Sequence, residues 1–310
     1  MDLKRHMGAL ATILSAIIFG FTPILARLAF DGGGNGITIT FLRSVLAIPV
    51  LYIVVKKNNI PLKLTRKEFG NVVLFGVLGV TITTIALSVS YEYIPVGIST
   101  TLHFIYPILV TTAGVLLFHD RVTKVKIIAL FLGIVGVLLF LEKGANIGLK
   151  GVLLALFSGF TYTFYMLGIE KTNLRNIHYF KLAFYFCIVT GVTTGIFGMA
   201  IGELNLHLTK EAWFYSFLIS IFVSVGAISL FQIGIKKVGA STAAILSTLE
   251  PITSIILGTL FLQELLTVPK IIGCVLIILS VILMTTMQEK GNVDSTDVIK
   301  KVDGSLYKNE

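Results

Sequence analysis

Long apolar runs separated by short polar connectors follow one another along the whole chain. Each is about 20 residues long, which is the length of helix that crosses the hydrocarbon core of a bilayer. Lipid offers the backbone no hydrogen-bond partners, so such runs are expected to be helices, and the alternating pattern of membrane strands is absent. We predict an all-α integral membrane protein with ten spans, numbered 1 to 10: 8–29, 37–55, 69–91, 95–118, 125–141, 149–168, 179–201, 212–235, 238–262 and 268–287.

Composition agrees with a membrane protein. Of the 310 residues, 55% are hydrophobic and 13% are charged, whereas a soluble domain carries about a quarter charged residues. A cleaved signal peptide would explain only the first run. The segment 288–310 is polar, carries both charge signs and is expected to be a disordered tail. Cys187 and Cys274 lie singly inside apolar runs, so we expect small core residues and neither a disulfide framework nor a metal site.

The basic residues predict how the chain is oriented in the membrane. The net charge is +9, and the lysines and arginines lie mainly between the apolar runs. Of these 25 residues, 19 fall on the side of the N-terminus (residues 1–7), which also holds the connectors after spans 2, 4, 6 and 8 and the tail. This bias places both termini in the cytoplasm of a cell whose plasma membrane the chain crosses. Topology explains the charge, and nucleic acid is not an expected partner.

An internal repeat divides the chain into two units, 8–141 and 149–287. A shift of 144 residues lays segment 107–139 on segment 251–283 with 12 of 33 positions identical. The matches include Pro107 with Pro251 and Lys126 with Lys270, and Asp120 falls on Glu264. Spans 1–5 therefore correspond to spans 6–10. A unit with an odd number of spans is inverted in its second copy, which is a plan typical of secondary transporters.

Three motifs resemble those of a known family. They are FGFTP in span 1 (19–23), FLRSVLA in span 2 (41–47) and VGASTAAILSTLEPITSIILGTLFLQE in span 9 (238–264). With them, the chain resembles drug/metabolite transporters of the EamA type over about residues 8–287. The resemblance implies ten helices in two inverted halves, a central cavity and, most often, export of amino acids or related metabolites. Drug, sugar and nucleotide-sugar carriers share the fold.

Glu250 is the sharpest candidate for function. It lies near the middle of span 9, where an acid costs roughly 2.5–3.5 kcal/mol on insertion scales and usually faces a cavity or a partner. Such a carboxyl group can exchange a proton or pair with a cargo amine; the alternative is a protonated Glu bonded to a neighbouring helix. Tyr106 occupies the equivalent position in the first half, so the repeat is asymmetric here.

Three prolines are predicted to interrupt spans. Pro23, Pro107 and Pro251 each remove one helical hydrogen bond, which would free the carbonyls of Phe19, His103 and Ser247. Unwound carbonyls in mid-membrane hold cargo or ions in transporters; the alternative is a kink that only shapes the bundle.

Two equivalent pairs follow from the repeat. His103 and Tyr106 share one helix face, as Ser247 and Glu250 do on the partner helix, and the pairs would approach each other about a pseudo-two-fold axis. His103 is a candidate to titrate with Glu250, with a buried histidine bonded to a carbonyl as the alternative.

Further polar residues are candidates for the cavity wall. Arg43, two turns into span 2, is expected to counter an acid, bind a cargo carboxylate or serve in helix packing. Gln232 in span 8, and Tyr162 and Tyr165 in span 6, lie on expected inward faces. Glycines in span 7 (191, 195, 198 and 202) form a small-residue seam, expected to make a contact within the chain rather than between two chains.

Other classes of protein fit less well. No Asp lies within a span, no His follows Ser241, and the sequence holds neither a His-Glu-x-x-His zinc motif nor the Gly-Lys of an ATP-binding loop. These absences argue against an intramembrane enzyme and an ATP-driven pump. A channel is not excluded, although no filter loop or ring of like charges is evident. We therefore predict a secondary transporter of a small molecule that needs no cofactor, couples to protons or runs as a uniporter, and acts as a monomer or homodimer.

Overall fold

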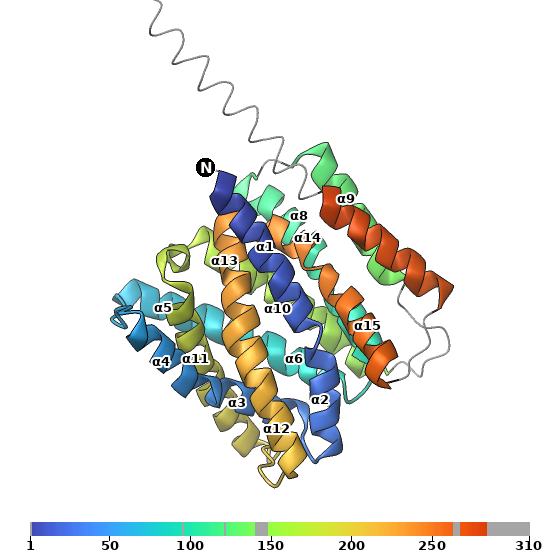
Figure 1. Cartoon of the computed structure of the whole chain (residues 1–310). Helices are drawn as coiled ribbons and strands as arrows, with labels where there is room; N and C mark the ends of the chain where they lie inside the picture. Colours follow the sequence, from blue (N-terminus) through green and yellow to red (C-terminus); the bar gives the residue numbers. More distant parts are fainter. Residues whose placement is uncertain (1, 95, 121, 140–147, 263–266, 284–310) are drawn as a thin grey trace, which may run out of the picture.

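The computed structural model describes residues 2–94, 96–120, 122–139, 148–262 and 267–283. These residues form helices and connectors without a β-strand (Figure 1). Eight of the helical stretches are long and apolar enough to cross a membrane. The described part of the chain is thus an all-helical membrane fold, while the predicted tail 288–310 and Glu264 lie outside the described residues.

Most predicted spans consist of two or three consecutive helical pieces. In the first half these are α1 (Asp2–Phe19), α2 (Thr22–Asp31), α3 (Gly36–Val45), α4 (Ala47–Lys57), α5 (Arg66–Leu74), η1 (Phe75–Thr81), α6 (Ile82–Ser90), α7 (Val96–His103), α8 (Tyr106–Phe118) and α9 (Lys124–Leu138). In the second half they are α10 (Leu149–Lys171), η2 (Asn173–Asn176), α11 (Tyr179–Ala200), α12 (Lys210–Leu218), η3 (Ile219–Ala227), α13 (Ile228–Val238), α14 (Ala240–Leu246), α15 (Leu249–Leu262) and the helix Val268–Leu283. The fifth predicted span holds α9, of 15 residues, and the tenth holds Val268–Leu283, and neither helix is among the eight long stretches.

The helix is interrupted just before each of the three prolines. Span 1 breaks between α1 and α2 ahead of Pro23, span 4 between α7 and α8 ahead of Pro107, and span 9 between α14 and α15 ahead of Pro251. Proline has no N–H to continue the ladder, and its ring clashes with the preceding turn. One expectation is corrected: the carbonyl of Ser247 is not free, because the N–H of Glu250 donates to it at 2.9 Å.

Two π-helical segments reproduce the repeat in three dimensions. The segment η1 begins at Phe75 in span 3, and η3 begins at Ile219 in span 8. Their starts differ by the same 144 residues that relate the two halves in sequence. π-Helical turns are rare and often occur at functional sites, so their matched positions indicate a shared structural role that the sequence pattern did not reveal.

The packing of the halves follows the same symmetry. α1 packs along α13, and its counterpart α10 packs along α6, so span 1 contacts span 8 as span 6 contacts span 3 (Figure 1). Spans 2 and 7 pack together through α3 and α11, and spans 4 and 9 through α8 and α14. The glycine seam of span 7 explains the close approach to span 2, since a Cβ at Gly195 would lie 2.9 Å from the Phe41 ring. Gly191, Gly195 and Gly198 thus make close contacts within the chain, as expected, whereas no described residue lies within 4 Å of a Cβ at Gly202.

The connectors sort into two groups, as alternating spans require. On the side of the N-terminus, Lys181 donates to the carbonyl of Lys63 at 2.7 Å, and Asn71 donates to Asn173 at 2.6 Å. On the opposite side, Asn35 donates to the carbonyl of Glu203 at 2.7 Å. Below, these are called the N-terminal side and the opposite side.

Candidate functional site

A cavity lies in the half of the bundle that faces the opposite side. Its volume is about 110 Å³, enough for several water molecules, since one needs on the order of 10–15 Å³ on this measure. Both halves contribute to its wall, and the two π-helical segments or the turns directly after them border it. Its polar and titratable lining residues are Thr22, Arg43, Ser44, Thr83, Thr84, Ser88, Tyr91, His103, Tyr162, Tyr165, Cys187, Thr190, Ser224 and Glu250.

Glu250 reaches the cavity from the first turn of α15, directly after the break in span 9. Its side chain is half-buried. Within the described residues, no hydrogen bond or ion pair to its carboxylate is found, although Tyr91, Tyr106 and Tyr162 lie within electrostatic range. The carboxylate is therefore available to a proton or to cargo.

The position of Glu250 depends on a tight joint between spans 1 and 9. A Cβ at Gly20 would lie 2.5 Å from the Thr253 Cβ and 3.0 Å from the Glu250 carbonyl oxygen. Ser254 closes the joint by donating its hydroxyl to the Gly20 carbonyl at 3.0 Å. The repeat partner of Gly20 is Gly159, where a Cβ would lie 2.7 Å from the carbonyl oxygen of His103. Glycine is needed in both halves because the backbones meet there.

Arg43 borders the same cavity from α3 and carries the opposite charge. Its Nε donates to the Ser224 hydroxyl at 3.2 Å, and no carboxylate of the described residues pairs with it. Tyr91 and Tyr162 lie within electrostatic range of both Arg43 and Glu250. One cavity thus presents a cationic and an anionic group, neither of which has a charged partner among the described residues.

His103 lines the cavity but is held by another helix. Its Nδ1 lies 2.8 Å from the hydroxyl of Ser158 in α10. The imidazole also packs against the Tyr106 and Tyr162 rings, with centroids 5.2 and 5.3 Å away. The described contacts of His103 do not include Glu250, so the expected coupling between them has no direct contact to support it.

Three predicted site residues do not border the cavity. Tyr106 is 1% exposed, packs edge-on against Tyr162 at 4.9 Å and lies within hydrogen-bonding reach of Ser247. Of the two repeat-related pairs, Tyr106 and Ser247 therefore meet behind the cavity wall, whereas His103 and Glu250 both border the cavity without a described contact between them. Gln232 is completely buried, and its Nε2 donates to the Tyr165 hydroxyl at 3.4 Å.

Several cavity residues escaped the sequence prediction. Tyr91, Ser224 and Cys187 all border the cavity, whereas the sequence predicts Cys187 only as a small core residue. Tyr91 ends span 3 and Ser224 lies within η3. Once Val80 is known to border the cavity, the repeat points to its partner Ser224 as a second lining residue. Nothing in the local sequence distinguishes Cys187 from a core residue.

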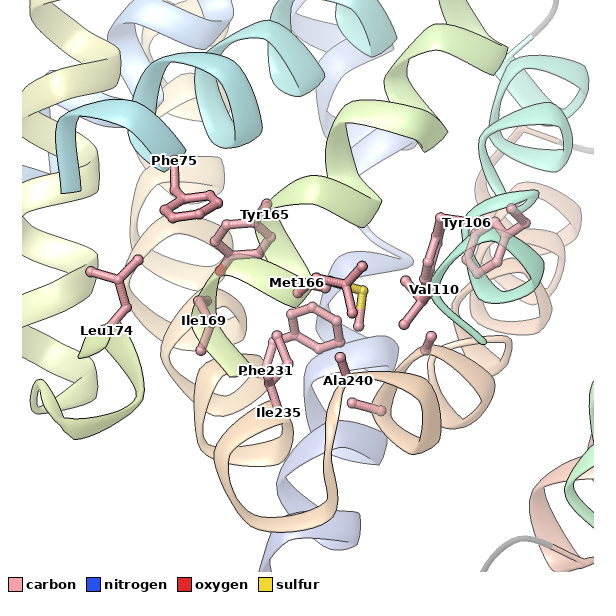
Figure 2. Close-up of a cluster of buried hydrophobic side chains, with 14 of the residues drawn as sticks. Phe75, Tyr106, Val110, Tyr165, Met166, Ile169, Leu174, Phe231, Ile235 and Ala240 are labelled. Carbon is pink, nitrogen blue, oxygen red and sulfur yellow. The ribbon is translucent and has the colours of Figure 1, made fainter. Parts of the chain in front are cut away.

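Packed apolar side chains close the cavity on the N-terminal side. Figure 2 shows Met166 and Ile169 of α10 near Phe231 and Ile235 of α13, with Ala240 of α14 beside them. Four of these five side chains are fully buried and Phe231 is 1% exposed. The structure thus represents a conformation closed on the N-terminal side, with its cavity in the opposite half.

Comparisons with known proteins agree with this architecture. The model of the EamA-like transporter family matches twice, over residues 6–142 and 149–286. The uncharacterized transporter YvbV of Bacillus subtilis is 28% identical over 232 residues, covering 72% of this chain and 74% of that protein. An uncharacterized transporter of Archaeoglobus fulgidus is 23% identical over 277 residues, covering 89% and 95%. A solved crystal structure superposes with a TM-score of 0.78 at 15% identity over 92% of this chain and 99% of that one, which is a likeness of fold.

Proposed function

This chain belongs to the EamA-like transporter family, and from that premise we propose that it is a secondary transporter that exports small zwitterionic metabolites such as amino acids. The proposal rests on one observation: Arg43 and Glu250, of opposite charge and without charged partners among the described residues, face one cavity. A zwitterion would pair its carboxylate with Arg43 and its ammonium group with Glu250. Charge-assisted hydrogen bonds of this kind contribute roughly 1.5–3 kcal/mol each.

Glu250 also supports coupling to protons. A carboxylate that binds either a proton or a cargo amine, but not both, exchanges one for the other as the cavity changes sides. Alternating access of this type is the mechanism that inverted repeats provide. We propose that cargo leaves the cell as a proton enters it. Export is the direction of cargo movement that the family resemblance implies.

The topology completes the proposal. We propose ten membrane crossings, with α9 and Val268–Leu283 as the fifth and tenth, and with both termini in the cytoplasm of a plasma-membrane protein. The excess of basic residues on the N-terminal side supports this orientation. Both halves of the chain contribute residues to the cavity wall, so we propose that one chain forms a complete transport pathway, whether it acts as a monomer or within a homodimer. A reporter that is active only in the cytoplasm should be active when it is fused to the C-terminus. Activity of a C-terminal reporter that works only outside the cytoplasm would refute the orientation.

Proteoliposomes loaded with labelled compounds test the cargo class. We expect counterflow of amino acids, with a much higher KM and a slower but measurable flux when either the carboxylate or the amine of the compound is removed. Glu250→Gln should fold normally and lose the pH dependence of flux, whereas Ser216→Ala, which alters a buried residue outside the cavity wall, should behave as the unmodified chain. Flux of sugars or hydrophobic cations without flux of amino acids would refute the cargo class. An unchanged pH profile in Glu250→Gln would refute the coupling role.

A further inference from the structure

Gln232 carries a buried polar group that its surroundings do not satisfy. The residue is 0% exposed, its Nε2 donates to the Tyr165 hydroxyl, and its Oε1 has no partner among the described residues. If the amide were turned over, the nitrogen would be left without a partner instead. The hydroxyl of Ser229, three residues earlier on the same helix, is also unsatisfied. Unpaired buried groups are destabilising, so this helix face is poorly adapted to the closed conformation.

The repeat relates Gln232 to a residue that already borders the cavity. The 144-residue offset, reproduced by the starts of η1 and η3, places Gln232 on Ser88, which lines the cavity. The neighbours agree, since Thr83, Leu87 and Tyr91 of the first half also line it. Their partners in the second half are, in order, Ala227, Phe231 and Ile235.

The two faces are in opposite states. The face of span 3 that includes Ser88 is open to the cavity, whereas Ala227, Phe231, Gln232 and Ile235 are each at most 1% exposed. Inverted halves exchange their shapes when the open side changes. We infer that Gln232 lines the cavity of the opposite conformation, open on the N-terminal side, and binds polar cargo there through the amide end that is unpaired in this one.

This role for Gln232 rests on the proposed transport function and extends it. A primary amide offers one acceptor and two donor hydrogens without a net charge. Its oxygen would accept from a cargo ammonium group that has left Glu250, and its N–H groups would donate to a cargo carboxylate. A neutral ligand on the N-terminal side would hold cargo less tightly than the charged groups Arg43 and Glu250.

Accessibility of single cysteines tests the inference without knowledge of the cargo. In a full-length background with Cys187→Ser and Cys274→Ser, the variants Ser88→Cys, Gln232→Cys and Ser216→Cys are exposed to a membrane-impermeant methanethiosulfonate in oriented vesicles. We expect Gln232→Cys to react from the N-terminal side and Ser88→Cys from the opposite side. Ser216 is the matched control, because it and its repeat partner Val72 are both buried, and Ser216→Cys should react from neither side.

The outcomes separate this inference from the proposed function. A Gln232→Cys variant that is protected from the N-terminal side, or that reacts only as slowly as Ser216→Cys, would overturn it. If Gln232→Cys does not fold, Ala227→Cys replaces it, since its partner Thr83 borders the cavity and the change adds one atom. Exchanged accessibility without amino-acid flux would leave the inference standing and refute the cargo class. Normal amino-acid flux together with a protected Gln232→Cys would refute the inference and leave the cargo class standing.

Discussion

Lys171 at the end of α10 binds both carboxylate oxygens of Asp120 at the end of α8, with Nζ–Oδ distances of 2.6 and 2.7 Å. The pair joins the two repeats across the N-terminal side. Asp120 is aimed there by a left-handed His119 (φ 55°), which ends α8 and lets the N–H of Asp120 donate to the Gly114 carbonyl at 3.0 Å. The ion pair therefore belongs to the set of contacts that close the N-terminal side.

Removing this ion pair should favour opening on the N-terminal side. The side chains are 20% and 34% exposed, so solvent screening limits the pair to about 1 kcal/mol, roughly a fivefold shift in population. For Asp120→Asn we expect spin labels at Lys124→Cys and Asn176→Cys, in the background without native cysteines, to show a larger population at long distance in pulsed electron resonance. The exposed pair Arg27–Asp31, at 3.6 Å, provides the control: Asp31→Asn should leave the distribution unchanged. An effect of Asp31→Asn equal to that of Asp120→Asn would contradict a specific role of the Lys171–Asp120 pair in closing the N-terminal side.

Gly20→Ala should disturb the joint that holds Glu250. The new methyl group would lie 2.5 Å from the Thr253 Cβ, and overpacking of this kind costs typically 1–3 kcal/mol. We expect a lower melting temperature in detergent and a large loss of flux. Gly70→Ala serves as the control, since nothing lies within 4 Å of a Cβ there and alanine is the better helix former. Equal melting temperatures for the two variants would mean that spans 1 and 9 accommodate the added methyl group without a loss of stability.

Ser224→Ala should weaken the binding of cargo carboxylates by Arg43. The serine hydroxyl accepts from Nε at 3.2 Å, and its loss leaves the guanidinium free to turn. A hydrogen bond to a charged group contributes roughly 1.5–3 kcal/mol, which sets an upper limit of about tenfold to a hundredfold on the rise in KM. Counterflow of an amino acid and of its decarboxylated amine should separate the effects, with KM rising for the amino acid only. A rise of equal size for both compounds would contradict a carboxylate site at Arg43.

His103→Gln should leave the pH dependence of flux unchanged. The imidazole contacts Ser158 at 2.8 Å rather than Glu250, and a glutamine amide can keep a hydrogen bond to that serine. We expect flux reduced by no more than a few fold, reflecting altered packing against Tyr162, with the same pH profile. Loss of the pH dependence in this variant would instead assign the proton to His103.

The sequence by itself determined the class of the protein and its symmetry. Apolar run length predicts membrane helices because lipid leaves the backbone no other partner. Prolines predict the interruptions because the missing N–H is a local property of the residue. The repeat relates positions as far apart as Pro107 and Pro251, and the position of Glu250 halfway along span 9 predicts that it lies near mid-membrane.

Only the tertiary structure decided which polar residues face the cavity. Arg43, Glu250, His103, Tyr162 and Tyr165 line it, while Tyr106, Ser247 and Gln232 lie outside its wall. Helices that are apolar on nearly every face give no periodic signal that separates lipid, neighbour and cavity. The two halves also share one order of spans and motifs, so which of them is open depends on how they pack. The ion pair between Lys171 and Asp120 and the packed apolar side chains around Phe231 result from that packing, and no local sequence pattern predicts them.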